Sequence, residues 1–145
     1  MDGAPSCWLI PYCHEFAVLA GAAAWDELTP AARDALRPRL EASVAAMRAF
    51  AEQGDVNFAH RVALLEAASF SIDGLLHAAI GKAREALAVS EAGGLMLEVV
   101  LAHDLLTRLF ARAARDEDAR RSATDALEAY ARWGAAGVVR QRTSA

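Results

Sequence analysis

The chain is divided into long alanine-rich segments separated by short polar or glycine-containing corners. Alternation of β-branched and polar residues between tight turns, the pattern typical of strands, is nearly absent. This arrangement predicts an all-α protein of about six helices, with corners short enough to make consecutive helices antiparallel. The expected helices cover about 10–25, 30–52, 56–72, 75–92, 95–114 and 117–133.

Proline and threonine mark the most specific boundaries. Thr29 followed by Pro30 predicts a helix start, because a threonine hydroxyl caps a free amide and proline fits the first helical position. Pro38 lies inside the same expected helix, so we predict a kink or break near Leu36 and Arg37.

A short phrase containing histidine recurs at His14, His60 and His103, always on the first helix of an expected hairpin. The intervals are 46 and 43 residues, close to the length of one helical hairpin with its corners. Equal register in successive hairpins is typical of an α-solenoid, in which neighbouring hairpins stack to bury a continuous core. We therefore predict a short TPR-like α-solenoid, with its concave side formed by these first helices.

Three stretches, two of which include a repeated histidine, carry a resemblance to a known family. They are Asn57–Arg61 with Leu64–Ala67, Glu98 with Leu101–Leu105, and Ala129–Ala135. In this order they resemble the tetratricopeptide-like helical segment of very large bacterial signalling proteins. Those proteins join a serine/threonine kinase-like domain and an AAA-type ATPase to PAS, GAF and histidine-kinase modules. The resemblance covers about Tyr12 to Gln141 and implies an inter-domain scaffold without catalytic residues. Because the other modules are missing, the chain is expected to be either a fragment or a free-standing relative.

Composition limits the classes of protein and partner. Hydrophobic residues make up 55% and charged residues 23% of the 145 positions, which is a globular balance. The net charge of -4 argues against a nucleic-acid partner. The longest apolar run, Phe16–Trp25, is too short to cross a membrane, and no secretory signal is visible. We expect a cytoplasmic protein with an irregular segment 1–9, one repeat domain 10–137 and a tail 138–145.

Motifs for familiar enzyme chemistry are missing. The sequence contains neither a phosphate-binding GxxxxGK[ST] loop nor a serine nucleophile elbow. Cys13 lies beside His14, but adjacent residues of a helix point about 100° apart, so this pair is not expected to form a catalytic dyad. Cys13 is instead expected to be a small buried core residue. His77 falls outside the histidine register and is expected at the surface.

The repeated histidines suggest a metal site. Imidazoles and carboxylates on one concave face could hold a divalent ion such as zinc, with His14, His60 and His103 as ligands. Glu15 and Asp104 would then complete the coordination or act as general base. The alternative is that each histidine makes an ordinary hydrogen bond between helices, since packed helix axes lie about 8 to 10 Å apart and the outer histidines would be far from each other.

An arginine-rich stretch and Trp133 can both be interpreted in structural terms. The arginine-rich stretch alternates with acidic residues, which we interpret as a solvated face, with a pocket for an anionic ligand as the alternative; its arginines are Arg108, Arg112, Arg115, Arg120 and Arg121. Trp133, next to Gly134 at a helix end, is expected to close the end of the core.

Three functions remain open at this level. The first is a scaffold or interaction module that binds a peptide, a helix or a neighbouring domain, with homodimerisation as a way to cover apolar ends. The second is a small metal-dependent hydrolase of phosphoryl or acyl esters, in which the metal activates a bound water. The third is a sensor domain that holds a small molecule between hairpins.

Overall fold

The computed structural model describes residues 9–53 and 58–144, and these residues form helices and short connections without a strand. Seven α-helices and one 3₁₀ turn lie within this part of the chain, so the expectation of about six helices was too low by one. The additional helix, α7, covers residues that were expected to be mostly tail. The elements are α1 (Leu9–Ala24), η1 (Trp25–Glu27), α2 (Pro30–Glu52), α3 (Ala59–Ile72), α4 (Leu76–Ala92), α5 (Met96–Arg112), α6 (Asp116–Trp133) and α7 (Ala136–Thr143).

The predicted start of α2 is confirmed. The Thr29 hydroxyl accepts a hydrogen bond from the Ala32 amide, and Pro30 occupies the first helical position. The helix then continues through Pro38 without the break that was considered. Pro38 is exposed, so water can reach the turn that loses a backbone hydrogen bond there. The expected boundary between the helices at 30–52 and 56–72 includes residues 54–57, which lie outside the described residues.

The corners after α3, α4, α5 and α6 are built alike. Each has one residue of positive φ, and these residues, Gly74, Gly94, Ala114 and Gly134, follow one another at equal intervals of 20 residues. The next amide in each corner donates to a carbonyl five residues earlier, as in Leu75 to Phe70 and Ala135 to Tyr130. Since one helix and its corner take 20 residues here, successive hairpins from α3 onward have the same length.

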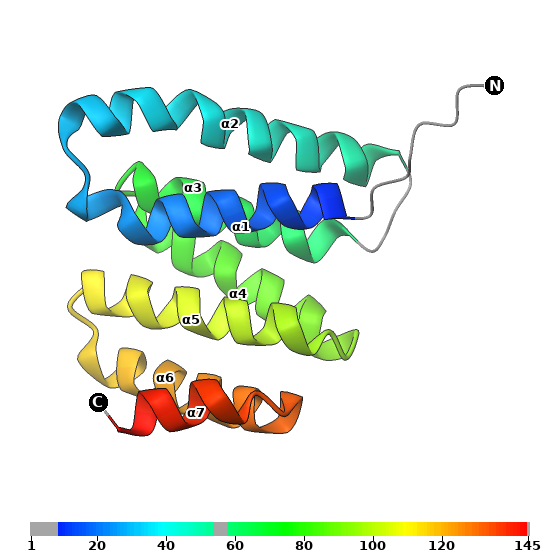
Figure 1. Ribbon diagram of the computed structural model, residues 1–145, viewed down its shortest axis with the longest axis vertical. Coiled ribbons are helices and arrows are strands. Elements are labelled where there is room, and N and C mark those ends of the chain that lie inside the picture. Colours follow the sequence, from blue (N-terminus) through cyan, green and yellow to red (C-terminus); the bar gives the residue numbers. More distant parts are fainter. Residues whose placement is uncertain (1–8, 54–57, 145) are drawn as a thin grey trace.

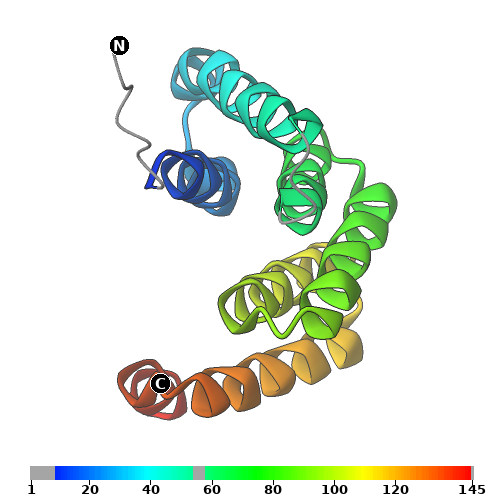
Figure 2. The same ribbon diagram turned by 90° about the vertical axis from the view of Figure 1, so that its right-hand side faces the viewer.

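The helices follow an arc with α1 and α7 at its two ends (Figure 2). Consecutive helices run antiparallel, as Figure 1 shows most clearly for α1 and α2. Helices α1, α3 and α5 line the inner side of the arc, and α2, α4 and α6 lie on its outer side. Within this inner row, which we define as α1, α3 and α5, contacts join α1 to α3 and α3 to α5.

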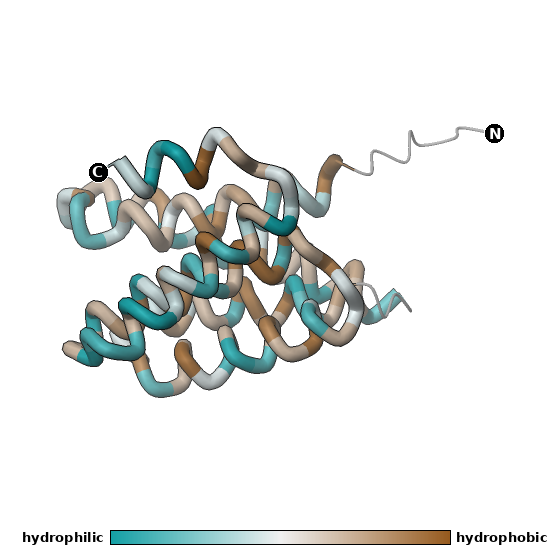
Figure 3. The backbone as a smooth tube through the Cα atoms, turned by 90° about the horizontal axis from the view of Figure 1, so that it is seen from below, coloured by the Kyte–Doolittle hydropathy of each residue, from teal (hydrophilic) through white to brown (hydrophobic). Residues whose placement is uncertain are grey.

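The core consists of two clusters. The larger cluster extends from α1 to α5 and includes Met47, Leu65 and Leu109, which have no exposed surface. The smaller cluster joins α5, α6 and α7 through Val100, Tyr130 and their neighbours. Figure 3 shows hydrophobic and hydrophilic residues mixed along the backbone of the described chain.

Two expectations about individual residues were wrong. Cys13 is exposed, because it lies on the side of α1 that faces away from α2 and α3. Trp133 is 48% exposed and does not close the core. That end is covered by α7, which packs Val138 and Val139 against the smaller cluster and has no fully buried residue of its own. His77, by contrast, is exposed on α4 as expected.

Among the described residues, no helix combines the length and the apolarity that crossing a bilayer requires.

Candidate functional site

A buried ionic network joins the three helices of the inner row. Arg61 of α3 donates from Nη1 to Glu15 Oε2 of α1 at 2.8 Å, and from Nη2 to Glu98 Oε1 of α5 at 2.5 Å. The Tyr12 ring covers the guanidinium, whose centre lies 4.0 Å from the ring centroid. Arg61 therefore binds one carboxylate from each neighbouring inner helix.

The network holds two carboxylates for one guanidinium. Glu15 has no exposed surface, and its Oε1 has no hydrogen-bond partner within the described residues. Burial raises the pKa of Glu15 to about 7, although the Arg61 charge partly opposes this shift. At Glu98 burial also acts upward, but nearby His60 and Arg61 outweigh it and lower the pKa. When one of the two carboxylates holds a proton, that proton is therefore bound preferentially by Glu15.

The three repeated histidines lie in different surroundings. His14 Nδ1 is hydrogen-bonded to Ser43 Oγ of α2 at 3.1 Å, on a different side of α1 from Glu15 and the inner network. His60 is buried beside Glu98, with 3.8 Å between Nε2 and Oε1, which is longer than a hydrogen bond. His103 is buried on α5, and its Nδ1 has no partner within the described residues. Among the three, only His14 therefore makes an interhelical hydrogen bond to another described residue, which was the alternative to metal binding.

No cluster of three or more histidine, cysteine, aspartate and glutamate side chains that could hold a metal ion occurs in the part of the chain that the structure describes. The two candidate general bases are also occupied. Glu15 binds Arg61, and Asp104 accepts a hydrogen bond from the Tyr130 hydroxyl at 2.7 Å and two from Arg142. The expected column of imidazoles is thus not assembled into a three-histidine centre.

Asp104 instead attaches α7 to the rest of the protein. Arg142 donates to both of its oxygens, at 2.6 and 2.9 Å, and the guanidinium lies 4.8 Å from the centroid of the Tyr130 ring. Burial and the hydrogen bond to Asp104 raise the pKa of Tyr130 to about 12, so its hydroxyl stays protonated and donating.

A cavity of about 290 Å³ lies between the inner helices and η1. Arg108 and Arg112 of α5 line one side, and Asp26 and Glu27 of η1 line another. Arg112 donates to the backbone carbonyl and hydroxyl of Ser71 and forms an ion pair with Asp26 at 3.3 Å. Arg108 forms no ion pair or side-chain hydrogen bond within the described residues, although the charge of Asp104 acts on it, so it is a cation without a directly bound partner there.

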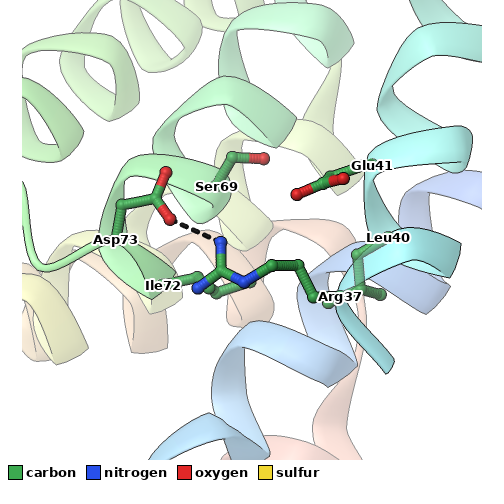
Figure 4. A pocket seen from close by; sticks show the side chains of 6 residues that line it. All are labelled: Arg37, Leu40, Glu41, Ser69, Ile72 and Asp73. Carbon is green, nitrogen blue, oxygen red and sulfur yellow. Dashed lines mark hydrogen bonds and ion pairs between the residues drawn. The ribbon is translucent and has the colours of Figure 1, made fainter. Parts of the chain in front are cut away.

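A second, much smaller cavity of about 40 Å³ lies between α2 and α3 (Figure 4). Arg37 and Asp73 form an ion pair of 2.6 Å across it, while Ser69 and Glu41 line the other side. Its volume is close to that of a single water molecule, so it is not a site for a larger ligand.

The network was only partly visible in the sequence. The residue after each repeated histidine is Glu15, Arg61 or Asp104, and these residues, rather than the histidines, make the strong contacts between helices. Glu98 does not share this register, and nothing local marks it as a partner of Arg61. The equal spacing of the corners was a detectable signal, since Gly74, Gly94 and Gly134 are visible in the sequence.

No protein-family model, curated protein or solved structure matches the chain.

Proposed function

We propose that this protein is a helical-repeat interaction module, arranged as a short TPR-like α-solenoid, whose inner row receives a segment of another protein or domain. The observation that carries the proposal is the cavity of about 290 Å³ between α1, η1, α3 and α5. It lies between helices of the inner row and contains both apolar and charged side chains, a combination that suits recognition of a protein segment.

The buried network supports the same proposal. Arg61, Glu15 and Glu98 are almost completely withdrawn from solvent, so they are not available for acid–base chemistry on a substrate. Their ion pairs hold α1, α3 and α5 in fixed positions relative to one another. This gives the inner row the rigidity that a preformed binding face needs.

The test uses a phage-displayed library of random 18-residue peptides, selected on the immobilised full chain. Selected peptides are then titrated into the isotopically labelled protein, and amide chemical shifts are followed by NMR. We expect saturable shifts concentrated in α1, α3 and α5. Shifts restricted to α2, α4 and α6, or a selection that yields no binding peptide, would contradict the proposed function.

A further inference from the structure

Helix α1 exposes an apolar line with a regular spacing. Its members are separated by four, three, four and three residues, and all of them are exposed, Leu9 by 47% and Phe16 by 45%. This is the spacing by which one helix of a coiled coil contacts another. We call this line the α1 seam, and it consists of Leu9, Cys13, Phe16, Ala20 and Ala23.

The α1 seam is not used in packing within the described residues. Helix α1 contacts α2 through His14 and α3 through Glu15, and both residues lie on other sides of the helix. Around the first half of the seam, Leu9, Cys13 and Phe16 line, with Tyr12, an open hollow of about 480 Å³. A partner could therefore reach the seam without any change in the fold.

The other end of the α1 seam leads to Arg108. Ala23 lines the inner cavity together with Arg108. Asp104, the carboxylate next to Arg108 on α5, is already held by Arg142 through two hydrogen bonds. Asp26 and Glu27 line the η1 side of the cavity, so a further acidic group would bind on the α5 side, beside Arg108.

We infer that the α1 seam and Arg108 together bind an amphipathic helix of a partner protein, with apolar residues along the seam and an aspartate or glutamate at Arg108. This inference rests on the proposed function and specifies the chemistry of the partner. The spacing of the seam favours a helix over an extended peptide, and the small Ala20 and Ala23 allow the partner backbone to approach closely. Charge complementarity requires the acidic residue at one end of that helix.

A second copy of α1 is a poorer match. The acidic residue within α1 is Glu15, which is fully buried and bound to Arg61. Pairing of two α1 helices would therefore bring apolar side chains, and no carboxylate from within the helix, to Arg108. Arg108, which forms no direct ion pair within the described residues, favours a different, acidic partner.

The experiment uses synthetic peptides from the phage selection, labelled with fluorescein and titrated by fluorescence anisotropy. We expect the selected sequences to contain apolar residues at alternating three- and four-residue spacing and an acidic residue near one end. Arg108→Glu should weaken binding by about tenfold or more, because a favourable charge contact becomes repulsive. Arg120→Glu, a matched change at an exposed arginine of α6, should alter binding by less than about twofold.

Charge exchange provides the decisive control. A peptide with its acidic residue changed to lysine should bind Arg108→Glu more tightly than it binds the wild-type chain. Phe16→Ser should weaken both peptides, and since Phe16 is exposed, the helical circular dichroism of this variant should be unchanged.

The outcomes separate the two proposals. Peptides that shift the inner row in the NMR experiment but lack acidic residues, or bind Arg108→Glu normally, overturn the partner chemistry and leave the proposed function standing. Shifts outside the inner row overturn both. Light scattering that shows a wild-type dimer and a Phe16→Ser monomer assigns the α1 seam to a second copy and overturns the inference.

Discussion

The pKa of the Glu15 carboxyl group is far from its value in water. A fully buried carboxylate is costly unless it is paired, and the single guanidinium nearby is shared with Glu98. The protein resolves this imbalance by retaining a proton on Glu15 up to a pH of about 7. The folded chain binds this proton more tightly than the unfolded chain does. The free energy of unfolding therefore falls as the pH rises.

The first prediction concerns this pH dependence. Between pH 5 and 7.5 the free energy of unfolding should decrease, by up to roughly 3 kcal/mol if the whole pKa difference is expressed. Glu15→Gln should remove most of this slope, since glutamine does not titrate. Urea unfolding followed by circular dichroism at several pH values measures the effect.

The control is Glu91→Gln, a change at an exposed glutamate of α4, which should keep the wild-type slope. A slope that persists in Glu15→Gln would show that another group is responsible. Glu98, whose pKa is lowered, acts in the opposite direction: its stabilisation is present above its unfolded-state pKa and is lost at more acidic pH.

At the scale of the elements, the corner residues decide where each helix from α3 to α6 ends. Three corners have glycine at the position of positive φ, where the absence of a side chain avoids a steric penalty. The corner between α5 and α6 has Ala114 instead, with φ of 54°. Its backbone nevertheless makes the same hydrogen bonds, since the Arg115 amide donates to the Phe110 carbonyl. The corner geometry is thus kept at the cost of local strain.

The second prediction uses this difference. Ala114→Gly should stabilise the protein by about 0.5 to 1 kcal/mol, because glycine adopts positive φ without strain. The same substitution at Ala88, exposed within α4, should destabilise the protein by about 1 kcal/mol. Thermal and urea unfolding of both variants check the opposite signs. A loss of stability in Ala114→Gly would contradict the account of strain at this corner.

At the scale of the whole molecule, most contacts join helices that are neighbours along the arc, and α7 touches α6 at one end. In such an arrangement, the effect of a local change is expected to remain local. The Arg142–Asp104 ion pair attaches α7 to α5. Helix α7 lies at the end of the arc opposite α1. Removal of this ion pair should loosen the end of the arc without disturbing the inner network.

The third prediction is that Arg142→Ala increases hydrogen exchange in α7 by about fivefold, which corresponds to roughly 1 kcal/mol for a partly exposed ion pair. Amides of α1 and α3 should exchange as in the wild type. Arg140→Ala, which removes an exposed α7 arginine without a side-chain partner in the described residues, is the matched control. An equal increase along all helices would instead indicate that the arc unfolds as one cooperative unit.

Local sequence signals account for where most helices begin and end. Caps, prolines and glycines act through contacts within a few residues, so Thr29, Pro30 and Gly134 could be interpreted without knowledge of the rest of the chain. The helical class and the short antiparallel corners follow from the same local preferences.

Which side chains meet depends on how the helices pack against one another. Neighbouring residues on a helix point about 100° apart, so a step of one residue separates His14, bound to α2, from Glu15, buried against α3. The exposure of Cys13 and the pairing of Arg61 with Glu98 depend on the position of helices far away in the sequence. No local pattern encodes that position, because it results from packing of the whole arc.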